Sequence, residues 1–145
     1  LRPASWIAEN DTINVTLQGF FALGCAQAGL DVVWRAYERR GAGFLREAHL
    51  ALQGELDRCR DRMAESLRPG ARLTKPEKLA LRAWTIDLAA RCAHAGVVAS
   101  SGAANSVEHD AQRVYREALG FSVSAQTAEI MESSLARLVG RGEPG

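Results

Sequence analysis

Few residues of this 145-residue chain combine the types and spacing that acid–base chemistry needs. The densest group is Glu108-His109-Asp110, where a histidine stands between two carboxylates. A catalytic dyad requires converging side chains, whereas adjacent residues on a helix point in diverging directions, and no nucleophile stands nearby in a strained turn. We therefore interpret the group as polar residues at the start of a helix, where the macrodipole favours carboxylates.

Metal chemistry needs ligands that cluster, and the sequence offers none. A di-iron bundle uses Glu-x-x-His pairs on facing helices, and this pattern does not occur. Glu47 and His49 are only two residues apart, which places them on different faces of a helix. His49, His94 and His109 are isolated from one another, so no zinc ligand set is indicated. We predict that the chain binds no metal.

The three cysteines, Cys25, Cys59 and Cys92, do not form a C-x-x-C pair, and each lies within a helical pattern. Such cysteines are typical of buried free thiols in a reducing compartment. We therefore expect a cytoplasmic protein with inert thiols. A redox or nucleophilic role is the alternative interpretation.

Nucleic-acid and membrane binding are disfavoured by composition. The chain has 18 basic and 17 acidic residues, a net charge of +1, which excludes a polybasic binder. Trp6, Trp34 and Trp84 are spread along the chain and do not form a stacking platform. Ser101-Gly102 carries one glycine and no following lysine, so it is not a phosphate-binding loop by motif. No apolar run approaches the ~20 residues of a membrane helix.

The elements that must position these residues are helices, in one domain covering residues 1–145. A first helix is predicted from about Asp11 to Arg39, with Asn10 or Asp11 as its N-cap and Gly41-Ala42-Gly43 as its stop. Gly24 and Ala28, four residues apart, are expected to admit a neighbouring helix closely. The inward stripe is predicted to be Ile13, Leu17, Phe20, Phe21, Gly24, Ala28 and Val32.

Two further long helices follow. One is predicted from about Phe44 to Leu67, and the next begins with Thr74 or Lys75 before Pro76 and runs to about Ser100. The seam of the second helix is predicted to be Leu45, His49, Leu52, Leu56, Cys59 and Met63. The stripe of the third is predicted to be Leu79, Ala83, Ile86, Ala90, Ala93 and Val97.

The last third of the chain has the pattern of a loop and two shorter helices. Residues 100–105 are small and polar and predict a loop, and Val107 to Leu119 predicts a short helix ended by Gly120. Ala125 to Val139 predicts the last bundle helix, followed by a frayed tail over residues 141–145. The expected architecture is all-α: an up-and-down four-helix bundle with a short extra helix before the last one.

The last third also resembles the C-terminal helical domain of the acyl-CoA dehydrogenase family. Ser101-Gly102 matches a small Gly-Gly loop, and residues 113–118 (Arg-Val-Tyr-Arg-Glu-Ala) match the family's (K/R)-x-x-R-(D/E)-A helix. Residues 125–130 fall where the family has Glu-Gly-Thr, a polar residue and then Ile. Upstream, residues 21–26 are similar to the first helix of that domain, with its small-residue step.

The resemblance implies the C-terminal domain of a longer flavoprotein, an oxidoreductase acting on the CH–CH bond of acyl-CoA thioesters. This domain would contribute FAD contacts and the dimer or tetramer interface, and would be inactive alone. The residues expected to contact FAD by this match are Ser101, Gly102, Gln126, Thr127 and Glu129. Arg116 and Glu117 match the family's Arg-acid pair, for which an ion pair that pins the helix is the favoured interpretation.

The chain departs from the family where a catalytic base would stand. Ala125 occupies the place of the usual glutamate, and the alternative position falls near Asn14, so no catalytic residue is assigned. A one-turn shift of the match would bring Glu9 or Asp11 into that role. Two alternatives stay open: a non-catalytic interaction or dimerisation module that kept the fold, and part of a flavin-dependent monooxygenase-like relative.

Overall fold

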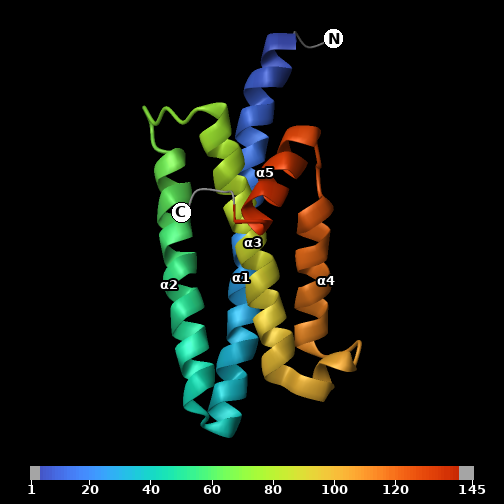
Figure 1. Cartoon of the computed structure of the whole chain (residues 1–145). Coiled ribbons are helices and arrows are strands. Elements are labelled where there is room, and N and C mark those ends of the chain that lie inside the picture. Colours follow the sequence, from blue (N-terminus) through green and yellow to red (C-terminus); the bar gives the residue numbers. More distant parts are fainter. Residues whose placement is uncertain (1–3, 141–145) are drawn as a thin grey trace.

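The computed structural model describes residues 4–140, with side chains from residue 16, and this span contains helices and no strand. Three long helices come first, α1 (Ala4–Arg40), α2 (Gly43–Ser66) and α3 (Lys75–Ser100) (Figure 1). A 3₁₀-helix, η1 (Ser101–Asn105), leads to two short helices, α4 (Asp110–Val123) and α5 (Ala128–Leu138). The predicted all-α helical bundle is confirmed.

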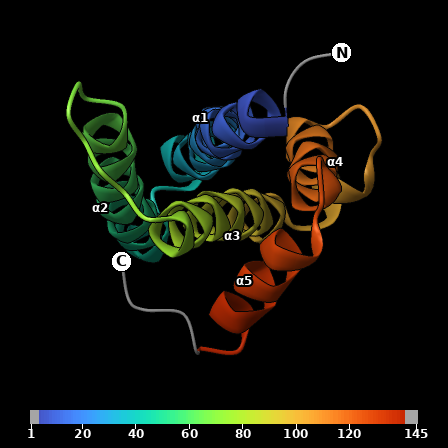
Figure 2. The same ribbon diagram turned by 90° about the horizontal axis from the view of Figure 1, so that it is seen from above.

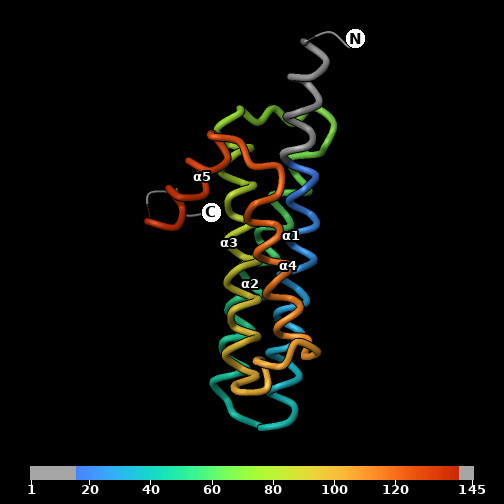
Figure 3. The backbone as a smooth tube through the Cα atoms, turned by 90° about the vertical axis from the view of Figure 1, so that its right-hand side faces the viewer, coloured from blue at the N-terminus to red at the C-terminus, as the bar shows by residue number. Residues whose placement is uncertain are grey.

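Helix α3 is the central element of the bundle. It contacts all the other helices, whereas the backbone of α2 runs close only to those of α1 and α3 among the described elements. Seen from above, α2 and α4 lie on either side of α1 and α3 (Figure 2), and in the side view α5 crosses α3 obliquely (Figure 1). Successive helices from α1 to α4 alternate in direction along the long axis (Figure 3). Thus α4 lies along both α1 and α3, while α5 packs mainly on α3.

Local backbone conformation and capping hydrogen bonds set the end of α1 and the start of α3. Gly41 has a φ of 66° directly after α1, a conformation that glycine adopts without steric cost, and this confirms the predicted stop. Thr74 caps α3: its hydroxyl accepts from the N–H of Glu77 at 3.4 Å, and the Glu77 carboxylate accepts from the N–H of Thr74 at 2.7 Å, the reciprocal pair of a capping box. Thr74 is therefore the N-cap, and Pro76 stands in the first turn.

The main core lies between α1, α2 and α3. The predicted seam of α2 is confirmed, because Leu45, Leu56, Cys59 and Met63 are buried and His49 and Leu52 are half-buried. A second cluster joins α1 and α3 to α4 through Val114. The main cluster consists of Leu23, Ala26, Leu30, Leu56, Cys59, Met63, Leu81, Trp84, Leu88 and Cys92. On α3, residues face neighbours on several sides, so the buried set is wider than the single predicted stripe.

The predicted inward stripe of α1 is wrong over its first half. Leu17 is 44% exposed, Phe20 37% and Phe21 68%, and Gly24 is exposed as well. Ile13 lies outside the residues whose side chains are described. The buried residues of α1 are instead mostly small: Thr16, Gly19, Ala22, Leu23, Cys25, Ala26, Gly29, Leu30, Val32, Val33 and Ala36. The prediction took the large apolar side chains for the inward face because they stand out in a hydrophobic pattern. In the structure, α1 packs against α3 through small side chains.

The predicted close approach at Gly24 is also wrong. A Cβ added to Gly24 would meet nothing within 4 Å, whereas one on Gly29 would lie 2.5 Å from the backbone carbon and oxygen of Cys92. On α3, a Cβ on Gly96 would lie 3.2 Å from the carbonyl oxygen of Gly29. The helices α1 and α3 therefore approach most closely around Gly29 and Gly96.

Several predicted boundaries differ from the structure. Asn10 and Asp11 lie within α1, which begins at Ala4, so neither is the N-cap. Residues 101–105 form η1 and not an open loop, and Gly120 lies within α4, which continues to Val123. A single glycine costs an exposed helix only about 1 kcal/mol, which tertiary packing readily offsets. The tail over residues 141–145 lies outside the described residues.

Candidate functional site

Ser101 and Gly102 directly follow α3, at the end of the bundle where η1 lies. Both are exposed, and a Cβ on Gly102 would meet nothing within 4 Å, so no cradle surrounds this glycine. Ser101 has φ 54° and ψ −142°, a combination that only glycine adopts without strain. Its backbone N–H reaches the carbonyl oxygens of Val97 and Val98 at the end of α3.

This strain makes Ser101→Gly a stabilising substitution. We expect the free energy of unfolding to rise by about 1 kcal/mol, because glycine adopts this conformation at little cost. Chemical denaturation of both variants measures the difference. Ser106→Gly is the matched control, since Ser106 has an ordinary extended backbone (φ −72°, ψ 129°) and glycine there only loosens the unfolded chain. Equal effects of the two substitutions would contradict the strain.

Gln126, Thr127 and Glu129 lie at the turn between α4 and α5. The hydroxyl oxygen of Thr127 accepts from the N–H of Ile130 at 3.3 Å and thereby caps α5. The carboxylate of Glu129 forms an ion pair with Lys75 at 2.7 Å. Ala125, which stands where the family's glutamate would be, is exposed and has a φ of 47°. The polar atoms of Thr127 and Glu129 thus already serve the fold.

The two predicted groups of FAD-contacting residues lie at opposite ends of the bundle. Ser101 follows the last residue of α3, and Glu129 pairs with Lys75, the first residue of that helix. The 26 residues of α3 extend over about 39 Å at the rise of an α-helix. The two groups of one chain therefore lie too far apart to contact one small molecule together.

Arg116 and Glu117 do not form the ion pair that was favoured for them. Glu117 pairs with Arg113 at 2.7 Å, one turn earlier on the same helix, and Arg113 also approaches Asp110 at 3.6 Å. Arg116 is exposed and takes part in no ion pair among the described residues. The contacts of Arg113 are exposed and lie within α4, so they contribute little and do not pin the helix to a neighbour.

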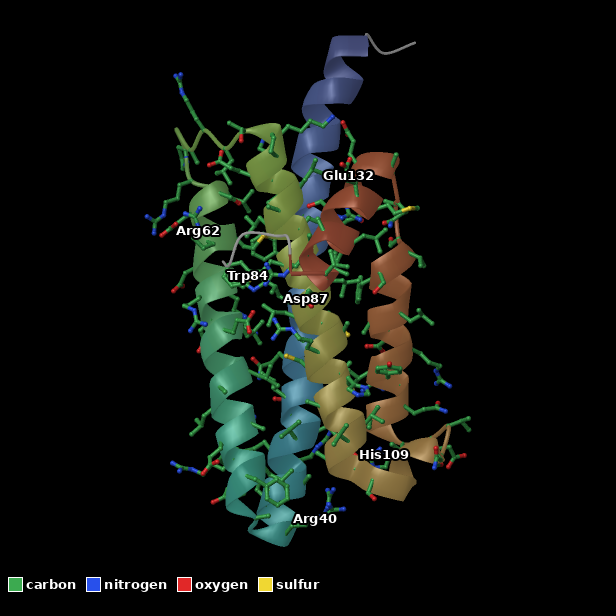
Figure 4. All side chains as sticks on the ribbon, in the orientation of Figure 1. Arg40, Arg62, Trp84, Asp87, His109 and Glu132 are labelled. Atoms are coloured by element: carbon green, nitrogen blue, oxygen red, sulfur yellow. The ribbon has the colours of Figure 1, made fainter. Side chains whose placement is uncertain are left out.

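His109 is confirmed as a helix-start residue. Its Nδ1 accepts from the N–H of Ala111 at 3.1 Å, and Figure 4 shows it at the start of α4. Asp110 pairs with Arg35 of α1 at 3.0 Å. A cavity of about 300 Å³ lies here, lined by Val32, Arg35, Arg39, Glu108, His109 and Asp110. Its two arginines face two carboxylates, so it presents no net charge that would select an ion.

The cysteines are buried and free, as predicted. Burial raises the pKa of Cys25 to about 11, and those of Cys59 and Cys92 to about 12. Thiols with such pKa values stay protonated at neutral pH and are poor nucleophiles. Across the described residues, no group of histidine, cysteine and carboxylate side chains could hold a metal ion. No helix of this same span has the length and apolar character to cross a bilayer.

Sequence reasoning missed a polar cluster where α5 meets α2 and α3. Arg91 contacts Glu55 at 2.5 Å and Asp87 at 3.0 Å, and Arg137 of α5 contacts Asp87 at 3.0 Å. Trp84 donates its indole N–H to Glu55 at 2.8 Å, and the Arg137 guanidinium lies 5.4 Å from the centre of the Trp84 ring. Figure 4 shows Trp84 and Asp87 on α3 in this region. We call these five residues the polar cluster.

The polar cluster joins three helices, and its positive and negative charges balance. Two arginines face two carboxylates, and Asp87, Arg137 and Glu55 are only 16%, 17% and 21% exposed. The hydrogen bonds from Arg91, opposed by burial, hold the pKa of Glu55 below its usual range. With each charge paired, the cluster holds α5 on the bundle and offers no free catalytic group.

Arg82 was also missed. It lies on α3, is only 3% exposed, and donates from Nη2 to the carbonyl oxygen of Ser124 at 2.7 Å. It therefore links α3 to the C-terminal end of α4, just before the turn that carries Gln126 and Thr127. A sequence signal existed, since Arg82 stands among the apolar residues Leu81, Ala83 and Trp84.

No protein-family model matches the chain, and the searches of curated proteins and solved structures found no match either.

Proposed function

We propose that this chain is an assembly-forming helical bundle, the C-terminal interface domain of an acyl-CoA dehydrogenase-like flavoprotein. The observation that carries the proposal is the amount of large apolar surface that the bundle leaves exposed. On α5, Met131, Leu135 and Leu138 are 49%, 54% and 67% exposed, and their spacing places them on one face. On α1, Leu17 and Phe21 are 44% and 68% exposed, and they also share one face of their helix. Apolar faces of this kind are typical of interaction surfaces.

The order of the elements also supports the proposal. The resemblance requires a small-residue break, a helix with the basic–acidic pattern, a turn and a last helix. The chain has η1, then α4 with Arg113 and Glu117, then the turn with Gln126 and Thr127, then α5. In this proposal each end of the bundle touches a different FAD, held mainly by other domains. FAD supplies hydride acceptance there; this chain offers the exposed Gln126 amide and the Thr127 hydroxyl proton as donors.

The proposal assigns no acyl-CoA base to this chain. Ala125 has no proton-accepting group, and Glu129 is already paired with Lys75. Oxidation of the thioester would therefore need a base supplied from outside the described residues. We place the protein in the cytoplasm, because three unpaired buried thiols suit a reducing compartment.

A second candidate function is a stand-alone dimerisation module with no cofactor. The separation of the predicted FAD residues along the length of α3 favours it, since the two groups of one chain lie too far apart to contact one small molecule together. One measurement distinguishes the two candidate functions. The product of the complete gene should retain a flavin with its visible absorption band if the first proposal holds. A colourless product that cannot be reconstituted with FAD favours the second.

Both candidates require self-association, which is tested directly. We expect sedimentation of this chain to show a dimer or tetramer. Leu135→Glu or Phe21→Glu should shift it towards monomer by at least about tenfold in dissociation constant, because a charge is placed in apolar contact. Leu50→Glu is the matched control, since Leu50 is 50% exposed but lies on another helix, α2. A chain that stays monomeric at all concentrations would overturn both candidates.

A further inference from the structure

Helix α5 is held on the bundle by one buried side chain and by charge. Of its 11 residues only Ile130 is buried, and its backbone runs close only to that of α3 among the described elements. Glu129 pairs with Lys75 at 2.7 Å, and Arg137 pairs with the carboxylates of the polar cluster. The pair with Lys75 is more than half exposed, so solvent screens it. Such a terminal helix opens at a lower free energy than the core.

The turn between α4 and α5 is short and strained. Only residues 124–127 separate the two helices. The carbonyl oxygen of Ser124 accepts a hydrogen bond from the guanidinium of Arg82 at 2.7 Å, which fixes the end of α4 to α3. The next residue, Ala125, has a φ of 47°, in the left-handed region that is costly for a residue with a Cβ. The strain therefore lies directly beyond a fixed point, and it is relieved when α5 leaves its place on the same chain.

A released α5 needs another surface on which to fold. Isolated helices shorter than about 12–15 residues are marginal in water, and release takes Arg137 away from the carboxylates of Asp87 and Glu55. The α3 of a second copy presents the same carboxylates, the same lysine and the same apolar recess. Every contact of α5 is regained there, because the two chains are identical. The closed and exchanged forms thus differ mainly in hinge strain and in the entropy of association.

We propose that two copies of this chain exchange α5, so that the α5 of each copy docks on the α3 of the other. Charge complementarity identifies the occupant, since Glu129 and Arg137 of α5 match Lys75 and Asp87 of α3. Relief of the strain at Ala125 favours the exchange, and the entropy of association opposes it. The exchange rests on the self-association proposed above and specifies how two copies join. It does not depend on a flavin.

Two charge reversals on different chains test the exchange. Arg137→Asp places a carboxylate against Asp87, and Asp87→Arg places a guanidinium against Arg137, so each variant repels its own α5. After the two variants are unfolded and refolded together, exchange pairs the two introduced charges with each other and the two native residues with each other. We expect native mass spectrometry to show heterodimers at least about tenfold above the statistical ratio, the effect of a restored charge-assisted pair.

The control for general charge attraction is a mixture of Glu47→Arg and Arg116→Asp. Both residues are exposed, on α2 and α4, and neither belongs to an ion pair among the described residues, so this mixture should give the statistical ratio. A statistical ratio for the Arg137→Asp and Asp87→Arg mixture would overturn the exchange and leave the self-association intact. A wild-type chain that is monomeric at all concentrations would overturn both.

The hinge gives a test in which the polar cluster is untouched. Ala125→Gly relieves the strain of the closed form, so the dissociation constant of the dimer should rise about fivefold for each hinge and roughly 25-fold for two. Ser124→Gly is the matched control, since Ser124 has an ordinary extended backbone (φ −67°, ψ 132°), and it should leave the constant nearly unchanged. Sedimentation measures both. An equal effect of the two substitutions would refute the exchange.

Crosslinking keeps the test decisive if the charge reversals do not fold. Lys75→Cys and Glu129→Cys alter exposed side chains and are carried by different chains, which are refolded together. A bismaleimide should join them into a covalent heterodimer, while the native thiols are buried and stay unmodified. Adding Ala125→Gly to both chains should reduce the yield. A dimer that gives no such crosslink would refute the exchange.

Discussion

Replacing Gly29 by alanine is expected to destabilise the chain by about 3 kcal/mol, at the upper end of the cost of overpacking a core. The added Cβ would lie 2.5 Å from the backbone carbon and oxygen of Cys92 and 2.7 Å from the backbone nitrogen of Ala93. Backbone atoms inside α3 cannot turn away as a flexible side chain does. The two helices must therefore separate, and the surrounding core loses contacts along the α1–α3 interface.

Chemical denaturation measures this effect, and Gly24→Ala is the matched control. Gly24 lies on the same helix, is exposed, and has nothing within 4 Å of an added Cβ. Alanine there should stabilise the chain by up to about 1 kcal/mol through its higher helix propensity. Two substitutions of the same type on one helix should thus act in opposite directions. If Gly29→Ala were neutral or stabilising, the close approach of α1 and α3 would be refuted.

Glu55→Gln is expected to lower the free energy of unfolding by about 2 kcal/mol, the effect of lost charge-assisted hydrogen bonds. Glutamine preserves the shape of the side chain and can still accept from the Trp84 indole. It removes the negative charge that faces Arg91 at 2.5 Å and Arg137 at 3.6 Å. Because these groups are only partly exposed, solvent screens the loss incompletely.

The effect of Glu55→Gln should depend on pH. The folded-state pKa of Glu55 is lowered. The contribution of its charge is therefore fully present above the unfolded pKa of about 4.3 and is lost as the pH falls through the folded value. The difference between wild type and variant should be largest near neutral pH and decline below about pH 4. Denaturant titrations at a series of pH values measure it.

Glu47→Gln is the control for the charge change itself. Glu47 is exposed on the same helix and belongs to no ion pair among the described residues. Its substitution should therefore change stability by less than about 0.5 kcal/mol, as is usual for a surface position. A deficit of Glu55→Gln that stays constant down to low pH would mean that the polar cluster acts through packing and not through charge.

The parts of the fold that were predicted well are those determined by local chemistry. Thr74, Pro76 and Glu77 specify the start of α3 through contacts within one turn. The seam of α2 was correct because α2 lies at the edge of the bundle, with one apolar face and one charged face. Gly41 likewise ends α1 by its own conformational freedom.

The FAD contacts of the candidate site stay a prediction, because its residues were assigned by resemblance and by their sequence neighbours. Thr127 and Glu129 lie at the expected turn, but the structure engages them in a helix cap and an ion pair with Lys75. The ion pairs of Arg137 with Asp87 and Glu55 join helices far apart in the sequence, which no local pattern reveals. The burial of Arg82 was not predicted, because it depends on the packing of α3 against the end of α4.

The sequence alone determined that the chain forms helices, where most of them begin and end, and that the three thiols are buried. These properties follow from hydrogen bonds, caps and apolar spacing within a few turns of chain. Only the tertiary structure decided which face of α1 is inward. A helix with large apolar residues on one face and alanine and glycine on another can bury either. Close packing against α3 favours the small residues, and it leaves the large side chains of Leu17 and Phe21 exposed.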